Sequence, residues 1–316
     1  MTALALALLL GAAPRPVHTY SIVARDPASG ELGVAVQSHW FSVGSVVSWA
    51  EAGVGAVATQ SFVDPSYGPL GLDLMRAGRS APEALAALIA GDAGRDVRQV
   101  GMVDAQGRAA THTGRLCIPA AGGQEGTHYV VQANLMDRPT VWPAMARAYE
   151  GASGDLAERM LAALDAAEAE GGDIRGRQSA ALLIVKGKST GRPWADRVFD
   201  LRVEDHPEPL RELRRLVRVQ RAYNHMTAGD DCVSVKDWGC AEREYGTARG
   251  LAPENAEMAF WTAVALATNG RLEPARPLFA QAFRADERWR ALARRRPAVG
   301  QLPEDPSLLR SILEIR

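Results

Sequence analysis

Residues 19–38 read TYSIVARDPASGELGVAVQS, and this stretch decides the fold at the start of the chain. Apolar residues lie on both sides of the turn-forming segment 26–30, which predicts two strands joined in a hairpin. If residues 1–18 were removed, Thr19 would carry a hydroxyl that can attack an acyl carbon. It would also carry an α-amine, with a pKa of about 8, that can accept the hydroxyl proton. The alternative is an internal strand threonine present for its β-propensity.

The segment before Thr19 is MTALALALLLGAAPRPVH, residues 1–18. Its apolar run has the length of a signal-peptide core and is too short to span a bilayer. Two features depart from an export signal: no Lys or Arg precedes the run, and His18 is a poor match to the small-residue cleavage rule. We therefore expect a periplasmic or secreted protein if this leader is a signal peptide, and a cytoplasmic one otherwise.

The composition limits the classes of partner. The 316 residues are 47% hydrophobic and 23% charged, which is enough apolar content for one large or two modest soluble domains. The net charge of -1 gives no overall attraction to nucleic acid, and no nucleic-acid-binding motif is present. Nothing after residue 18 predicts a membrane span. Nucleic acid is therefore not an expected partner.

The cysteines and histidines predict no metal site. Cys117, Cys232 and Cys240 are too few for a disulfide framework and lack paired metal spacing, although Cys232 and Cys240 could form either one bridge or two buried thiols. The histidines are scattered, and the short G-x-G at residues 53–55 is too short for a nucleotide fingerprint. We expect neither a metal nor a cofactor.

Strand-like and helical patterns alternate up to about residue 206. Strands are predicted at residues 20–25, 32–37, 53–59, 97–103, 109–113, 129–133, 180–185 and 198–203, and helices at 68–77, 81–89, 142–149 and 156–170. Hairpins followed by helical pairs favour antiparallel sheet with helices packed on it. The expected class is a layered α+β sandwich.

The pattern from residue 222 onward is helical and contains an internal repeat. A small–aromatic–small set recurs after 34 residues, the tetratricopeptide period: Ala241, Tyr245 and Ala248 return as Ala275, Phe279 and Ala282. Two such units are fewer than a free-standing solenoid needs, so we expect the tail to lean on the main domain or on another subunit. It is either a binding surface or a packed helical appendage.

Six separated blocks carry a family resemblance: TYSIVARD, GELGVAVQS, GVGAVATQS, PSYGPLGL, GMVDAQGR and GGDIRGRQSAALLIV. In this order they resemble the bacterial and archaeal family called domain of unknown function 1028 (DUF1028), which belongs among the Ntn-hydrolase-like folds. Many members begin Met-Thr, whereas here Thr19 occupies that place behind a longer leader. The tail also resembles a C-terminal module of some members for which peptidoglycan binding has been suggested.

The resemblance implies a domain organisation. Residues 1–18 would be the leader, residues 19–220 a four-layer αββα Ntn-hydrolase-like sandwich, and residues 221–316 a small all-α TPR-like domain. The active site would lie at the end of the first strand, where the terminal residue attacks an amide and nearby donors hold the oxyanion.

Polar residues at strand ends are the candidates to support Thr19. Asn134 could donate its side-chain NH2 to an oxyanion with Gln132 on the same face, or both could close backbone hydrogen bonds. Ser38 would lie beside Thr19 if the hairpin register is tight. Thr59 and Gln60 precede the loop 63–69, which is either a substrate-site rim or a plain connection.

The block 173–179, DIRGRQS, is the densest polar cluster before an apolar strand. Arg175 could bind an acidic substrate group with Asp173 orienting it and Gln178 alongside. The alternative, which we favour, is an Asp173–Arg175 pair that fastens the loop.

Two functions stay open at this point. The first is an N-terminal-nucleophile amidohydrolase that acts, after removal of residues 1–18, on a small amide or peptide-like bond, with Thr19 and Asn134 as its catalytic groups. The second is a catalytically inactive Ntn-like scaffold that binds a ligand or assembles a homo-oligomer, and whose helical tail recruits a protein partner or cell-wall component. No sequence feature names the substrate.

Overall fold

The structure is a computed structural model that describes residues 19–316, so the predicted leader, residues 1–18, lies outside the described residues. The chain divides into two compact units, Met1–Arg214 and Arg215–Arg316. This division lies close to the boundary expected near residue 220. Whether the units are the Ntn-like and TPR-like domains stays a prediction.

A six-stranded antiparallel sheet forms one layer of the first unit. Its strand order is β10-β9-β2-β1-β8-β7. The strands are β1 (Thr19–Arg25), β2 (Leu32–Ser38), β7 (Gly122–Gly126), β8 (Tyr129–Ala133), β9 (Ser179–Val185) and β10 (Arg197–Val203). β1 and β2 pair along their whole length, from Arg25 opposite Leu32 to Thr19 opposite Ser38. The hairpin therefore has the tight register that places Ser38 beside Thr19.

A four-stranded antiparallel sheet forms the second layer, in the order β3-β4-β5-β6. Its strands are β3 (Ser48–Glu51), β4 (Gly55–Ser61), β5 (Arg98–Asp104) and β6 (Ala109–Thr113). Between the sheets lies an apolar core made by alternate residues of both layers, among them Val23, Val34, Val36, Ala56, Ala58 and Val103.

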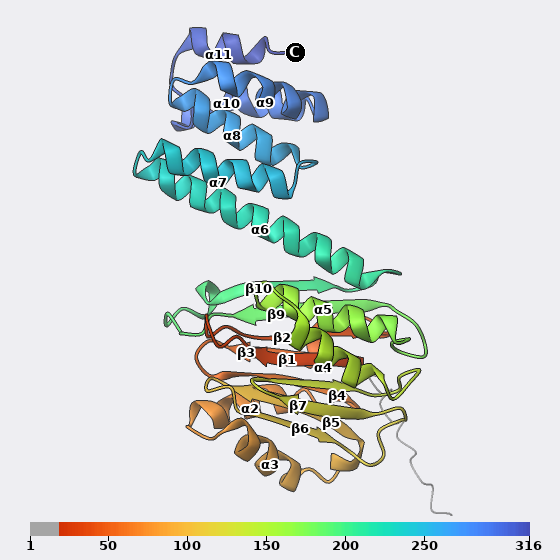
Figure 1. Cartoon of the computed structure of the whole chain (residues 1–316). Coiled ribbons are helices and arrows are strands. Elements are labelled where there is room, and N and C mark those ends of the chain that lie inside the picture. The colour runs from red at the N-terminus through yellow and green to blue at the C-terminus, as the bar shows by residue number, and fades with distance from the viewer. Residues whose placement is uncertain (1–18) are drawn as a thin grey trace, which may run out of the picture. The chain divides into compact units, whose positions relative to one another are not determined.

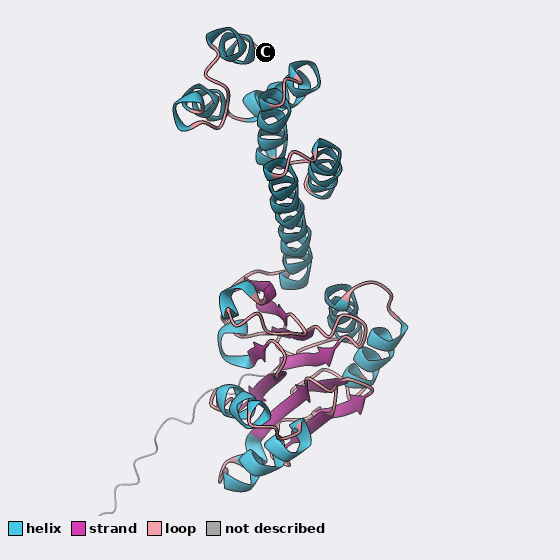
Figure 2. Cartoon of the chain, turned by 90° about the vertical axis from the view of Figure 1, so that its left-hand side faces the viewer, coloured by secondary structure: helices cyan, strands magenta, loops and turns pink. Residues whose placement is uncertain are grey.

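Helices cover the outer face of each sheet (Figures 1 and 2). α2 (Tyr67–Arg76) and α3 (Ala81–Gly91) pack on the four-stranded sheet, whereas α4 (Val141–Gly151) and α5 (Leu156–Ala169) pack on the six-stranded sheet. The start of α3 is fixed by a capping box in which Ser80 and Glu83 bond each other's backbone N–H. The first unit is thus an α+β fold with antiparallel sheets.

Three short elements were not expected from the sequence. α1 (Gly44–Val47) and β3 are four residues each, and β7 reads GGQEG, a composition that disfavours strands. β7 exists because it pairs along β8, from Gly122 opposite Ala133 to Gly126 opposite Tyr129. Tertiary pairing overrides the weak local propensity there.

The second unit is helical. Its helices are α6 (Pro209–Ser234), which begins in the first unit, α7 (Trp238–Leu251), α8 (Ala256–Thr268), α9 (Leu272–Ala285), α10 (Arg288–Arg295) and α11 (Pro306–Leu313). The repeated small and aromatic residues of α7 and α9 are all buried, as a helix-packing repeat requires. Cys232 and Cys240 form a disulfide, and Cys117 is a buried free thiol. Within residues 19–316, no helix combines the length and apolar character that crossing a membrane demands.

Candidate functional site

Thr19 is the first residue of β1, a central strand of the six-stranded sheet. Alternate residues of β1 face the other sheet, as Ser21 does by donating its hydroxyl to Gln60 Oε1 at 2.7 Å. Thr19 lies on this inner face and donates its Oγ1 hydroxyl to Ser38 Oγ at 3.2 Å. The hairpin register thus places Ser38 beside Thr19, and both side chains are fully buried.

The backbone carbonyl of Thr19 is held from both sheets. It accepts a bond from the backbone N–H of Asn134 at 3.1 Å and from Gln60 Nε2 at 3.0 Å. Asn134 Nδ2 lies 3.5 Å from the same oxygen. Because Asn134, directly after β8, and Gln60 of β4 both donate to this carbonyl, the backbone of Thr19 is held from both sheets.

Four buried side-chain amides lie between the two sheets near Thr19, and we call them the amide network. They belong to Gln60, Gln99, Gln132 and Asn134. Gln99 is its centre, because Gln99 Oε1 accepts from Gln60 Nε2 and from Asn134 Nδ2, each at 2.8 Å. Gln132 Nε2 donates to the Ala58 carbonyl at 3.2 Å. All four side chains are fully buried.

Such a network is unusual in a sandwich core. Burying polar groups costs free energy unless every one is bonded, and an apolar filling of the same volume would stabilise the fold more simply. The other end of the same sandwich is filled with valine and alanine, such as Val34 and Ala56. A polar core confined to the end where Thr19 begins is a sign of a functional site.

A second set of polar residues joins the outer face of β1 and β2 to α5. Tyr20 and Gln37 are partners across β1 and β2, and both donate to Glu168 Oε2 of α5, at 2.6 and 2.8 Å. Arg177 pairs with the other oxygen of Glu168. Burial, together with the neighbouring Glu168 carboxylate, raises the pKa of Tyr20 well above its usual value, so the phenol stays a neutral donor. These bonds hold Tyr20 and Gln37, the chain neighbours of Thr19 and Ser38, in place.

The loop that precedes β9 is fastened beside Ser38. The buried Asp173 carboxylate accepts from Arg175 Nη2 at 2.6 Å and from the backbone N–H of His39 at 3.2 Å. The backbone N–H of Gln178 donates to the Ser38 carbonyl at 3.1 Å. The structure therefore has the loop-fastening Asp173–Arg175 pair, and Gln178 contributes through its backbone.

Thr59 points away from Thr19. Its hydroxyl donates to the Asp64 carbonyl at 3.1 Å. Strand alternation puts Thr59 on the opposite face of β4 from its neighbour Gln60. Thr59 and Gln60 therefore do not share one rim: Gln60 reaches the Thr19 carbonyl, and Thr59 shapes the loop after β4.

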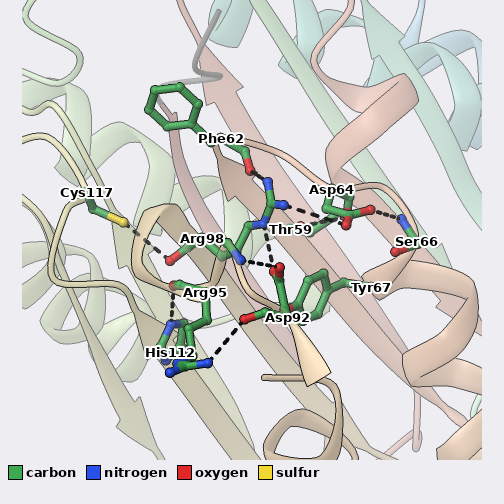
Figure 3. Close-up of polar contacts among 11 residues, drawn as sticks. Thr59, Phe62, Asp64, Ser66, Tyr67, Asp92, Arg95, Arg98, His112 and Cys117 are labelled. Carbon is green, nitrogen blue, oxygen red and sulfur yellow. Dashed lines mark hydrogen bonds and ion pairs between the residues drawn. The ribbon is translucent and has the colours of Figure 1, made fainter. Parts of the chain in front are cut away.

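That loop is held by Arg98 (Figure 3). Arg98 Nη1 donates to the Phe62 carbonyl at 2.5 Å, and Arg98 Nε donates to Asp92 Oδ2 at 2.8 Å. Tyr67 donates its hydroxyl to the same Asp92 oxygen at 3.0 Å. Burial alone would raise the pKa of Asp92, but the bonds from Arg98, Gly94 N–H and Tyr67 outweigh it and hold the pKa below its usual value.

Backbone strain marks the same end of the sandwich. Ser61 and Leu135 have φ values of 69° and 56°, in the left-handed region that non-glycine residues avoid. They directly follow Gln60 and Asn134 of the amide network. Conformations of this kind cost about 1 kcal/mol or more and persist chiefly where the surroundings require them, often at functional sites.

Sequence reasoning missed Gln99 and Glu168. Gln99 had a local signal, because it is an inward polar residue in the alternation Gln99, Gly101, Val103. Glu168 had none, because its partner Tyr20 lies 148 residues away in the sequence.

Comparisons with known proteins place this fold among relatives. The sequence model of the family described as "Family of unknown function (DUF1028)" matches residues 19–213, so the matched region starts at Thr19. A crystal structure of a DUF1028 protein from Silicibacter pomeroyi is similar, with a TM-score of 0.58 and 30% sequence identity. The match covers 67% of this chain and 88% of that one. No curated protein matches the chain.

Proposed function

The chain belongs to the DUF1028 family, and we propose that its first unit is an N-terminal-nucleophile hydrolase that cleaves a small amide or peptide-like bond with Thr19. The observation that carries this proposal is the position of Thr19. It opens a central strand, its hydroxyl is hydrogen-bonded to Ser38, and its carbonyl is fixed by the amide network.

The layering supports the same proposal. Two facing antiparallel sheets with one helical pair on each outer face correspond to the four-layer αββα sandwich of Ntn hydrolases. In that fold the nucleophile is the first residue of a central strand. We therefore assign the first unit to that superfamily as part of the proposal.

The mechanism begins with removal of residues 1–18, which converts the Thr19 peptide nitrogen into an amine. The amine accepts the Oγ1 proton while Oγ1 attacks the substrate carbonyl. The amide nitrogen leaves with that proton, and water then hydrolyses the ester on Thr19.

The supporting residues act through position. Asn134 Nδ2 donates one hydrogen to Gln99 and directs the other at the Thr19 carbonyl 3.5 Å away, so Asn134 would have to give up one of these two contacts to serve an oxyanion. We therefore propose that Asn134, Gln60 and Gln99 position Thr19. In the described structure the Thr19 hydroxyl donates to Ser38 Oγ, which orients the attacking oxygen, and the hydrogen turns to the amine once the amine is free.

The test is covalent labelling of a chain that starts at Thr19. Residues 19–316 are released from a tag whose cleavage leaves Thr19 first, and a β-lactone probe is added. Attack by the hydroxyl opens the lactone and adds the full probe mass as an ester. We expect one probe per chain on Thr19, found by peptide mapping.

Two variants control this experiment. Thr19→Val keeps the shape and removes the hydroxyl, so it should not be labelled. Thr262→Val removes another buried threonine hydroxyl, one that bonds its own helix at Met258, and should be labelled normally. Labelling of Thr19→Val at the wild-type rate, or none of the Thr19-first chain, would refute the proposal.

A second function rests on a separate observation. In the full-length chain the Thr19 nitrogen is bonded to His18 and the Thr19 side chain is fully buried. A chain that keeps its leader would be an inactive Ntn-like scaffold that binds a ligand or forms a homo-oligomer. Removal of the leader by export would place the active form in the periplasm or outside the cell, and other processing would leave it in the cytoplasm.

The helical unit fits a recruiting role in either case. It contains a groove of about 550 Å³ lined by apolar, aromatic and charged side chains, including Met226, Tyr245, Glu257, Trp261 and Arg296. We propose that this unit is TPR-like and contacts a protein partner or peptidoglycan. Binding of the full-length protein to purified peptidoglycan sacculi, with and without Trp261→Ala, tests this role.

A further inference from the structure

The groove of the helical unit is lined by four parts of the chain. Met226 and Asp230 belong to α6, Tyr245 to α7 and Trp261 to α8, and Arg296 directly follows α10. Methionine, valine and alanine side chains supply an apolar part of the lining. The groove volume of about 550 Å³ lies within the range of roughly 300–1,000 Å³ that small-ligand sites have. It is therefore large enough for a ligand of several hundred daltons.

Arg296 brings a positive charge to this groove without an anionic partner. Its guanidinium carbon lies 3.9 Å from the centre of the Trp261 ring. Nη1 donates to the neutral Gln301 side chain, whereas the buried Nε has no hydrogen-bond partner among residues 19–316. Burial, with no carboxylate to offset it, lowers the pKa of Arg296 from its usual value, although the group stays charged. Arg288 on α10 shows the contrast, because its hydrogen bond to Asp286 raises its pKa.

Glu257 brings a negative charge to the edge of the same indole. Its Oε1 accepts from Trp261 Nε1 at 3.1 Å, and its Oε2 accepts from the Tyr223 hydroxyl. Both donors are neutral, so they leave the charge of the carboxylate uncompensated. Within the described part of the chain, neither Glu257 nor Arg296 belongs to an ion pair. Two opposite charges therefore contact one indole, at its edge and over its face, without pairing with each other.

A second carboxylate lines the groove about two helical turns along α6 from Tyr223. Asp230 Oδ1 accepts from the neutral Tyr245 hydroxyl at 2.6 Å. The two carboxylates disfavour a ligand that carries only negative charge, and a ligand that carries only positive charge would leave Arg296 without an anion. A ligand with one ammonium and one carboxylate complements both kinds of charge.

From these observations we propose that the groove binds a short peptide with free ends, whose carboxylate pairs with Arg296 and whose ammonium pairs with Glu257. The planar fork of a guanidinium matches a carboxylate in geometry as well as in charge. The apolar side chains of the peptide lie against the methionines and valines of the lining. This inference rests on the recruiting role proposed for the helical unit and names its ligand, and it does not depend on the hydrolase proposal.

The experiment is calorimetric titration of the full-length chain with three peptides: leucyl-leucine, its N-acetyl derivative and its C-terminal amide. The protein carries Thr19→Val, so that no processed form can hydrolyse the peptides. We expect leucyl-leucine to bind, and each blocked peptide to bind roughly tenfold more weakly or worse, because each has lost one charge-assisted pair.

Two variants assign the two ends of the peptide. Arg296→Gln should weaken leucyl-leucine binding about tenfold and abolish the preference over the amide, while the preference over the N-acetyl peptide remains. Glu257→Gln should do the reverse. Arg288→Gln and Glu254→Gln are the matched controls, because they remove the same charges at exposed positions outside the groove lining. Both controls should leave all three affinities unchanged.

Three results would overturn the inference: no binding of leucyl-leucine at millimolar concentration, equal affinity of the wild-type groove for the three peptides, or a variant that weakens all three by the same factor. If the protein still binds peptidoglycan sacculi in a manner that Trp261→Ala abolishes, the recruiting role stands with a different ligand. Loss of both kinds of binding would remove both proposals.

Discussion

Replacing Gln99 by methionine tests whether the amide network is as tightly bonded as its geometry indicates. Methionine has a similar volume and no amide, so the change deletes hydrogen bonds without opening a large cavity. Five hydrogen-bond contacts are lost: Gln60 and Asn134 donate to Oε1, and the two hydrogens of Nε2 are shared among Thr113, Gly122 and Ala133.

The size of the effect follows from the four hydrogen bonds that one amide can make, two accepted and two donated. A buried hydrogen bond contributes about 1 kcal/mol net, and a partner left unsatisfied costs roughly 1–3 kcal/mol. Because Gln60 keeps its bond to the Thr19 carbonyl, the losses are not fully additive. We expect a fall of about 3–5 kcal/mol in the free energy of unfolding, a large share of the 5–15 kcal/mol typical of a domain.

The assay must report the first unit alone, because the chain divides into two compact units and two-state unfolding does not hold in general for such chains. Urea titration followed by pulsed hydrogen exchange, read in peptides that contain β1 and β8, meets that need. Gln124→Met on β7, an exposed position, is the control and should change stability by less than about 0.5 kcal/mol. A loss below about 1 kcal/mol for Gln99→Met would refute the reasoning, because it would mean that the network is not fully bonded in the folded protein.

Three further perturbations have defined outcomes. Tyr20→Phe removes one of the donors to Glu168 and should lower the free energy of unfolding by about 1 kcal/mol, seen in calorimetry as a fall of roughly 2–4 °C in the melting transition of the first unit. The lowered pKa of Asp92 means that its stabilisation is full above about pH 4 and is lost as the pH falls through the folded-state pKa. Asp92→Asn should therefore flatten the acid side of the stability profile in urea titrations, and an unchanged acid slope would exclude this role. Ala282→Leu overpacks the fully buried face of α9 and should cost about 1–3 kcal/mol by circular dichroism melting, whereas a neutral result would mean that this face has spare room.

The hairpin shows how far local sequence can lead. Turn residues between two apolar strands predicted the pairing but left the register open. The observed register is tight, with Ser38 opposite Thr19. The eight predicted strands and four predicted helices of the first unit are all present, within two residues at each boundary. These elements follow from patterns a few residues long.

The site itself depends on contacts that local patterns do not contain. Glu168 reaches Tyr20 across 148 residues, and the glycine-rich β7 forms only against β8. Gln99 could have been found by matching inward polar positions on neighbouring strands. Thr59 shows the reverse error: the alternation of a strand already placed it on the opposite face from Gln60.

The central claim is that Thr19 becomes the first residue of the working protein. The most direct measurement is the intact mass and N-terminal sequence of the protein purified from its native cells. The account predicts one mature form that begins at Thr19. A form in which Thr19 remains inside the chain, whatever residue it starts with, would contradict the account, because the amine that takes the hydroxyl proton would not exist.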